Sequence, residues 1–407
     1  MSYRSQNLFA ALFVCLAGHM AVAQPTLPPD YVAEPATGAG VTGPNVPPFW
    51  VRPGLRVDFV AHIPGARFLE FNDKGDLYVS LPRDGTIATL RDVNGTWQRI
   101  ANFTTGKNSV HGMHFFNGWL WFTQSDAIWK AQDDGNGKAV NETAVIPSGT
   151  LPGNSGHWWR SILVTPDGFY TSVGDQSNVG ENEGDREKIW FYNLDGTGKK
   201  LFCTGIRNTE KLRLRPGTSE VWGCDQGSDN FGVPYGDTKG HQPITDHFPP
   251  DKFNHYVQDG FYGHPYIMPN GIPRPEYASR PDIDNYAAQM IQPAWPLGPH
   301  WASDGWCFDT KGGVADPGDA LIALHGSWNS SVQVGYRIER ILFDPVTGQP
   351  YGSLRLVSTL GPPTTNGSNR ALLARPVDCA QAPDGSIFFS DDDHGGIYRI
   401  SAVNPTH

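Results

Sequence analysis

One hydrophobic pattern recurs along the chain: an apolar strand, a glycine-containing turn, and a second strand rich in aromatic or β-branched residues. This pattern predicts pairs of antiparallel strands. Outer strands follow several copies, for example at residues 335–343 and 396–400. The six copies span residues 68–80, 113–123, 161–172, 212–222, 306–324 and 377–390.

Six copies of four strands each predict an all-β fold, a six-bladed β-propeller. No domain boundary interrupts the series, so residues 54–407 are expected to form one domain. A pair of β-sandwiches is the competing all-β fold, but Pro-Asp-Gly turns recur at matching places, 166–168 and 383–385. Residues 227–303 and 352–370 lengthen the spacing between copies, and such insertions usually become loops on one face, where binding sites are built.

The N-terminus has the features of a secretory signal peptide over residues 1–23: Arg4 at the start, an apolar stretch at 7–17, and the small-residue cleavage site Ala21-Val22-Ala23. The mature protein is therefore expected to be periplasmic or secreted. Residues 24–53 are rich in proline and are predicted to be an extended N-terminal extension on the surface. No later stretch approaches the roughly 20 apolar residues that a membrane-spanning helix needs.

Composition narrows the range of partners. The 407 residues carry a formal net charge of −10, and only 18% of them are charged, without long runs of one sign. Binding to a nucleic acid or to an anionic membrane needs clustered Lys and Arg. The sequence thus argues against both partners and leaves a small-molecule ligand.

Four cysteines remain if the signal peptide, which contains Cys15, is removed. In an oxidising compartment an even number suggests two disulfides. The pairs Cys203–Cys224 and Cys307–Cys379 are favoured, because the first flanks one strand-turn unit and the second occupies equivalent places in successive units. Buried free thiols are the alternative.

The polar residues just before each innermost strand are expected to meet at the central channel of a propeller, although they lie far apart in sequence. Several arginines in a narrow cavity repel one another unless an anion lies among them, and arginine is suited to bidentate contact with a carboxylate. The sequence therefore predicts a ligand with several carboxylates. The residues at these positions are Arg67, His111, His157, Arg160, Arg207, Asn208 and Arg375.

His157 is the leading candidate for a general base, because an imidazole with a pKa near neutrality can remove a hydroxyl proton. A hydrogen-bonded structural histidine is the alternative. His111, His114, His300 and His325 are further candidates, but their spacing indicates no zinc site. Residues 224–230 are dense in oxygen donors, which makes hard-cation binding plausible, an ordinary polar turn being the alternative.

From about residue 67 to residue 401 the chain resembles the soluble quinoprotein sugar dehydrogenases, and more closely their sorbosone and pyranose dehydrogenase relatives. Three stretches carry the resemblance: residues 157–176, residues 204–208 with 221–227, and residues 254–265. The resemblance implies a six-bladed propeller that uses pyrroloquinoline quinone (PQQ) and calcium. Departures include Thr209 where proline is usual, and no lysine at the position of Trp328 or Asn329.

The resemblance also implies roles for single residues. His157 would be the catalytic base, the carbonyl oxygens of Gly227 and Ser228 would hold calcium, and His111 and His325 would lie near the substrate or cofactor. The residues expected to bind the cofactor are Arg67, Arg207, Asn208, Gln226, Trp328 and Arg375.

The expected activity is oxidation of a sugar hydroxyl or aldehyde by hydride transfer to PQQ, with electrons passing to an acceptor such as a cytochrome or a quinone. A calcium-dependent propeller lactonase is one alternative, although such sites are usually rich in carboxylates. A non-catalytic propeller that binds carbohydrate or protein through exposed tryptophans is the other.

Overall fold

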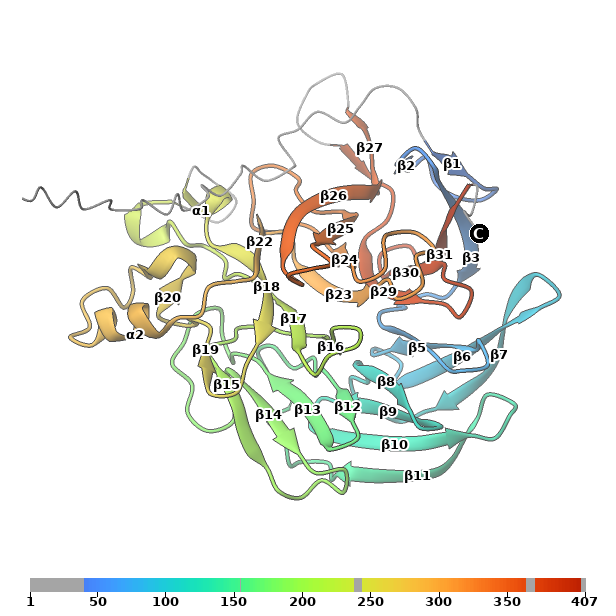
Figure 1. Cartoon of the computed structure of the whole chain (residues 1–407), viewed down its shortest axis with the longest axis horizontal. Coiled ribbons are helices and arrows are strands. Elements are labelled where there is room, and N and C mark those ends of the chain that lie inside the picture. Colours follow the sequence, from blue (N-terminus) through green and yellow to red (C-terminus); the bar gives the residue numbers. More distant parts are fainter. Residues whose placement is uncertain (1–39, 154, 238–243, 364–369, 404–407) are drawn as a thin grey trace, which may run out of the picture.

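In the computed structural model, residues 40–153, 155–237, 244–363 and 370–403 are described. Six antiparallel sheets of four main strands each are arranged in a ring (Figure 1), which confirms the predicted six-bladed β-propeller. The predicted signal peptide, residues 1–23, lies outside the described residues. No helix in the described part of the chain has the length and apolar character needed to cross a membrane.

The first three blades are built from consecutive strands. Blade 1 contains β4 (Leu69–Phe71), β5 (Leu77–Leu81), β6 (Thr86–Val93) and β7 (Thr96–Thr104). Blade 2 contains β8 (Met113–Phe116), β9 (Trp119–Gln124), β10 (Ala127–Asp133) and β11 (Ala139–Ile146). Blade 3 contains β12 (Leu163–Thr165), β13 (Gly168–Val173), β14 (Lys188–Tyr192) and β15 (Lys200–Thr204), with β19 (Gly260–Phe261) added in parallel.

The next two blades continue the series. Blade 4 contains β16 (Leu212–Leu214), β17 (Val221–Asp225), β18 (Pro250–Tyr256) and β22 (Trp295–Pro299). Blade 5 contains β23 (Ser303–Phe308), β24 (Ala320–Leu324), β25 (Arg337–Phe343) and β26 (Pro350–Ser358), with β2 (Trp50–Val51) at its edge. The short elements between or beside blades are η2 (Val233–Tyr235), α1 (Ile244–His247), β20 (Ile267–Met268), η3 (Pro269–Gly271), β21 (Ile272–Pro273), α2 (Ile283–Gln289), β27 (Leu360–Pro363) and β28 (Arg370–Leu372).

Blade 6 joins both ends of the propeller. Its inner strands are β29 (Pro376–Gln381), β30 (Ile387–Asp391) and β31 (Gly396–Ala402). The outermost strand is β3 (Leu55–His62), which pairs antiparallel with β31, and β1 (Val41–Thr42) adds to β3 in parallel. The ring is thus closed by backbone hydrogen bonds between strands from opposite ends of the chain.

The hydrophobic core lies between neighbouring blades. Each of the six main clusters combines residues of two adjacent sheets, so the apolar faces of the sheets pack against one another around the ring. Between blades 4 and 5, the rings of Trp222 and Trp306 are fully buried against Phe253. Strands buried on both faces explain why the sequence shows continuous apolar runs.

The two predicted insertions are only partly loops. Residues 227–303 contain β18 and β22, and residues 352–370 contain part of β26 and β27, so these segments also supply outer strands. The N-terminal extension is not confined to the surface either. In its described part, the side chains of Phe49 and Val51 are buried in the cluster between blades 5 and 6.

The favoured disulfides are wrong, because all four described cysteines are free thiols. Cys203 belongs to the cluster between blades 3 and 4, whereas Cys224 packs between blades 4 and 5. Cys307 and Cys379 share one cluster but remain unbonded. Burial raises the pKa of the Cys307 thiol to about 12, so the thiol stays protonated and unreactive.

Candidate active site

The candidate site lies at one end of the central channel, where the innermost strands begin. We call this end the channel mouth. Arg67 precedes β4, Arg207 precedes β16 and Arg375 precedes β29. In an antiparallel pair the second strand ends where the first begins, so the residues after the second strands reach the same place. Asp175, which follows β13, and Asp392, which follows β30, therefore also lie at the mouth.

His157 is held by the backbone of Asp175. The His157 backbone N–H and its ring Nδ1 both lie 2.9 Å from the carbonyl oxygen of Asp175. A hydrogen bond to this carbonyl requires a proton on Nδ1, which leaves the lone pair on Nε2. Burial and the charge of Arg207 lower the pKa of His157 to about 4, so the imidazole is neutral at ordinary pH. A neutral, oriented imidazole is what a general base requires.

Gly174 lies where the segments that carry His157 and Arg207 pack closely against the backbone that follows β13. Asp175 accepts a hydrogen bond from His157 and donates its own N–H to the carbonyl oxygen of Arg207, at 2.9 Å. Gly174 makes room for this arrangement: a Cβ there would lie 2.7 Å from both the Arg207 carbonyl oxygen and the Cβ of His157.

Replacing Gly174 by alanine is therefore expected to cost about 1–3 kcal/mol of unfolding free energy, because the strained contacts cannot relax without moving His157 or Arg207. Urea unfolding measures this change. Gly352→Ala is the matched control, since its Cβ would first meet the tip of the flexible Leu342 side chain, at 3.1 Å. Equal losses in the two variants would contradict this account.

Arg160, predicted to line the channel, is fully buried and bonds to backbone. Its buried guanidinium donates to the backbone carbonyl oxygens of His157 and Pro152. Burial and the nearby Arg186 lower the pKa of Arg160 to about 9. Arg160 thus braces the segment that carries His157.

Arg207 and Asn208 lie on the blade 4 side of the mouth. The Arg207 guanidinium donates to the backbone and side-chain oxygens of Asn178, both at 2.9 Å, and lies 3.4 Å from a carboxylate oxygen of Asp229. The Asn208 amide donates to Gln226 at 3.0 Å and to Glu210 at 2.9 Å. The predicted cofactor residues Arg207, Asn208 and Gln226 are therefore neighbours in the structure.

Arg67 is surrounded by carboxylates that the sequence analysis missed. Its guanidinium lies 2.7 Å from Asp392, 2.9 Å from Asp304 and 3.4 Å from Glu210. Burial alone would lower the pKa of Arg67, but these three carboxylates raise it above its usual value. The prediction that the channel arginines repel one another without an anionic ligand is therefore wrong for Arg67, which is already compensated by acidic side chains.

Arg375 differs from Arg67. Its Nε donates to the carbonyl oxygen of His325 at 3.2 Å, and no ion pair joins it to a carboxylate of the described residues. His325 lies beside it and hydrogen-bonds to Asp392 at 3.0 Å. Burial is the main reason why the pKa of His325 falls to about 4. Arg375 is thus a half-buried cation at the mouth with N–H donors to spare for an anionic ligand.

The other predicted residues lie at different depths. His111 is fully buried, stacks on Trp159 with ring centroids 4.5 Å apart, and lies behind Arg67 at 3.3 Å rather than on an open substrate side. Trp328 is 57% exposed on the loop between β24 and β25. His300 approaches Asp229 at 3.7 Å, and although burial would lower the pKa of His300, the hydrogen bonds to Asp229 and to the Thr245 carbonyl raise it.

The backbone at Gly227 and Ser228 has features that suit a calcium ion. Both residues line a cavity of about 20 Å³, which is room for one particle of water size. Among the described residues, none donates a hydrogen bond to either carbonyl oxygen. The Ser228 hydroxyl is already bonded to Arg274, so the carbonyl oxygens are the free ligands at this point.

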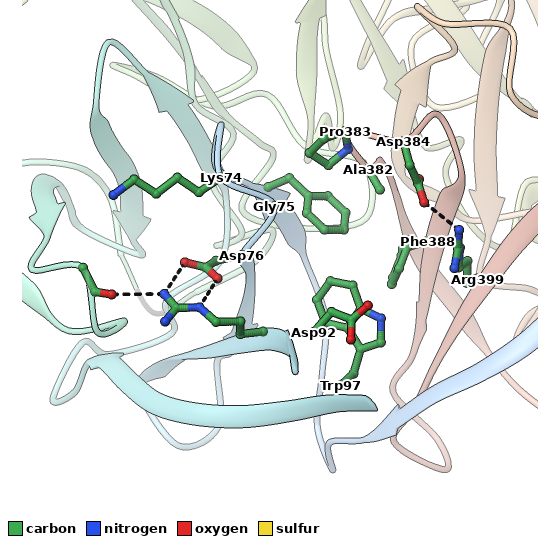
Figure 2. A pocket seen from close by; sticks show the side chains of 13 residues that line it. Lys74, Gly75, Asp76, Asp92, Trp97, Ala382, Pro383, Asp384, Phe388 and Arg399 are labelled. Atoms are coloured by element: carbon green, nitrogen blue, oxygen red, sulfur yellow. Dashed lines mark hydrogen bonds and ion pairs between the residues drawn. The ribbon is translucent and has the colours of Figure 1, made fainter. Parts of the chain in front are cut away.

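A larger cavity of about 560 Å³ lies away from this site, between blades 1 and 6 (Figure 2). It is lined by the β4–β5 and β29–β30 turns, at the ends of the innermost strands opposite to the mouth. Figure 2 shows the Asp384–Arg399 pair on one side and Asp76 on the other. Asp76 forms an ion pair with Arg91. None of the predicted site residues lines this cavity.

Comparison with known proteins gives one family match. The model of the family described as TrAA12-like matches residues 50–403. A curated protein described as uncharacterized, from Borreliella burgdorferi, is 26% identical over 267 residues, which cover 63% of each chain. The chain therefore matches less than two thirds of the length of that relative.

Solved structures confirm the fold. The holo form of the pyranose dehydrogenase PQQ domain from Coprinopsis cinerea is 19% identical, with a TM-score of 0.70 over 89% of this chain and 100% of that one. The calcium structure of a Trichoderma reesei family AA12 carbohydrate-active enzyme is 17% identical, with a TM-score of 0.70 over 90% and 99%. The apo form of the soluble aldose sugar dehydrogenase from Escherichia coli is 14% identical, with a TM-score of 0.60 over 86% and 99%.

Proposed function

The chain belongs to the TrAA12-like family, and from this membership we propose that it oxidises a sugar hydroxyl or aldehyde by hydride transfer to PQQ held together with calcium. One observation carries the proposal. A neutral imidazole, His157, is held with its Nε2 available at the same channel mouth as Arg207 and Arg375, and Arg375 forms no ion pair with a described carboxylate. Oxidation beside a polycarboxylate cofactor requires a base to remove the substrate proton and cations to bind the cofactor.

The residues at the mouth fit such a cofactor. PQQ is a tricarboxylate, and Arg375 and Arg207 would bind its carboxylates through their guanidinium N–H groups. Gln226 would add an amide donor, oriented by the hydrogen bond that its side-chain oxygen accepts from Asn208, and the carbonyl oxygens of Gly227 and Ser228 would hold calcium. When bound, PQQ would supply the hydride acceptor.

His157 would act on the substrate through Nε2. The Nδ1 proton stays on the hydrogen bond to the Asp175 carbonyl, and Nε2 removes the proton from the sugar hydroxyl or aldehyde hydrate as the C–H bond breaks. Arg207, close to this ring, disfavours the protonated imidazole and keeps the base ready. The Asp175 backbone, which links His157 to Arg207, fixes the distance between base and cofactor cation.

Reconstitution tests the proposal. Purified protein is mixed with PQQ and calcium, quinone binding is followed by absorbance, and pyranoses and sugar aldehydes are then assayed with a dye acceptor. Both saturable quinone binding and dye reduction are expected. Absence of both would overturn the proposal, and lactone hydrolysis without quinone would favour a propeller hydrolase. Export to the periplasm or medium stays a prediction, because residues 1–23 lie outside the described residues.

The pH dependence gives a separate expectation. His157 acts as a base only when it is neutral, and its pKa of about 4 keeps it neutral down to acidic pH. We therefore expect kcat/KM to fall only as the pH drops through about 4, well below the usual pKa of histidine near 6.5. Steady-state rates of the reconstituted protein across this range measure the acid limb. An acid limb near 6.5 would show that His157 is not held neutral in this way.

A further inference from the structure

Behind His157, one imidazole and two carboxylates converge from three separate segments. Asp175 follows β13, Glu187 precedes β14, and His264 follows β19; all three are buried. Nε2 of His264 lies 2.7 Å from Oδ2 of Asp175 and 3.8 Å from Oε1 of Glu187. The three potential ligand atoms all lie within 4.8 Å of one another. We call these residues the His264 triad.

The carboxylates of the triad lack a cationic side chain of their own. Among the described residues, neither Asp175 nor Glu187 forms an ion pair with Lys or Arg. Arg186 is close by, but its guanidinium donates to the carbonyl oxygen of Gly174 and to Ser155. Burial in this place is costly for two carboxylates whose partners, apart from the His264 imidazole, are all neutral N–H and O–H donors.

Neutral donors hold the carboxylates in position. The Asn182 amide lies 2.7 Å from both Asp175 Oδ1 and Glu187 Oε1, and the Ser177 N–H donates to Asp175 Oδ1 at 2.6 Å. These bonds orient the two acids toward His264 without neutralising them.

We propose that the His264 triad binds a divalent first-row transition metal ion, with zinc or cobalt as the test ions. One nitrogen and two carboxylate oxygens suit such an ion, whereas calcium requires six to eight oxygen ligands. The metal takes the place of the proton that His264 shares with Asp175. Three protein ligands leave one position of a tetrahedral site for water.

The triad and the calcium position proposed at Gly227 and Ser228 use different ligand atoms, although His264 also lines the cavity beside those two residues. The triad lies on the other side of Asp175 from His157: the Asp175 side chain faces the triad, while its backbone carbonyl holds the base. A bound ion would join the segment from Asp175 to Glu187 to the segment at His264. It would therefore stiffen the support of His157 without touching the substrate.

Metal titration without quinone tests the site independently of the proposed function. Chelator-treated protein, kept in excess calcium to fill any all-oxygen site, is titrated with Co²⁺ and followed by its visible spectrum, then with Zn²⁺ by calorimetry. One equivalent is expected to bind with the intense cobalt bands of a site of low coordination number. His264→Ala and Glu187→Gln are each expected to weaken binding by more than about 100-fold, because each removes a ligand.

Matched variants separate the triad from the surface. Glu183→Gln makes the same chemical change at an exposed carboxylate of the same loop, and His62→Ala removes an exposed imidazole. Both are expected to bind metal like the original protein. Absence of stoichiometric binding, or equal affinities in Glu187→Gln and Glu183→Gln, would overturn the proposal. Circular dichroism of Glu187→Gln, which keeps the side-chain shape, confirms that the variant is folded.

Discussion

Replacement of His157 by asparagine is expected to lower kcat of the quinone-loaded protein by about 10²- to 10⁴-fold, the usual contribution of a positioned general base. Asparagine can keep the hydrogen bond to the Asp175 carbonyl, but it offers no basic nitrogen in place of Nε2. The cofactor cations Arg207 and Arg375 are unchanged in this variant, so quinone binding should persist. Dye-coupled steady-state kinetics measure the loss, and absorbance titration measures the bound quinone.

His62→Asn is the control for the His157 variant. His62 is exposed on β3, where its ring bonds to the carbonyl oxygen of His394, and its loss should leave kcat unchanged. Full turnover in His157→Asn would remove His157 from the mechanism and would favour another base. Retained ligand binding without turnover in the original protein would instead indicate a non-catalytic propeller.

Arg375→Ala is expected to weaken PQQ binding by about 10²- to 10³-fold in the presence of calcium. The guanidinium of Arg375 donates one hydrogen bond to the His325 carbonyl oxygen and forms no ion pair with a described carboxylate. Its remaining N–H groups are therefore available to the cofactor. Removing one partner of a half-buried, hydrogen-bonded charge pair typically costs about 2–5 kcal/mol, and each tenfold loss of affinity corresponds to about 1.4 kcal/mol. Equilibrium titration of the purified variant with PQQ measures the change.

Arg399→Ala serves as the control for Arg375→Ala. Arg399 is paired with Asp384 beside the cavity between blades 1 and 6, at the opposite end of the strands (Figure 2). This variant should bind PQQ normally. Equal affinity in Arg375→Ala and the original protein would show that another cation, such as Arg207, carries the cofactor alone.

The inner strands of every blade could be predicted from the sequence, because they are buried on both faces and keep an apolar pattern across a glycine turn. The outer strands of blade 4 could not. The edge strand β22 reads Trp-Pro-Leu-Gly-Pro, and the third strand, β18, begins with proline. Proline disfavours a central strand but is tolerated at a sheet edge and as the first residue of a strand. Edge strands have weaker sequence signals, so residues 227–303 looked like one long insertion.

The sequence analysis predicted the basic residues of the candidate site but not the acidic ones. Arg67, Arg207 and Arg375 precede innermost strands and were found by that rule, whereas Asp392 and Asp175 follow second strands and were missed. The signal was present in the sequence, because antiparallel pairing brings the end of each second strand beside the start of the first. Applying the rule to both ends would have shown acids among the arginines.

The cysteines show a different limit. An even number of cysteines in a chain expected to be exported favoured two disulfides. Whether two cysteines can form a disulfide, however, depends on which face of a sheet each one occupies. Cys203 and Cys224 pack into different clusters. The face on which each cysteine lies is set by the geometry of its blade. The spacing of cysteines along the chain does not predict that geometry.

The pairing of β3 with β31 has a consequence for how the protein is made. During synthesis the first strand of the propeller waits without its partner until almost the whole chain has left the ribosome. Until then β3 presents an unpaired edge, which is a place where unfinished chains can associate with one another. Contacts between such distant parts of a chain also form slowly. The closing blade is therefore where a nascent chain is most exposed to aggregation and where a chaperone would help it most.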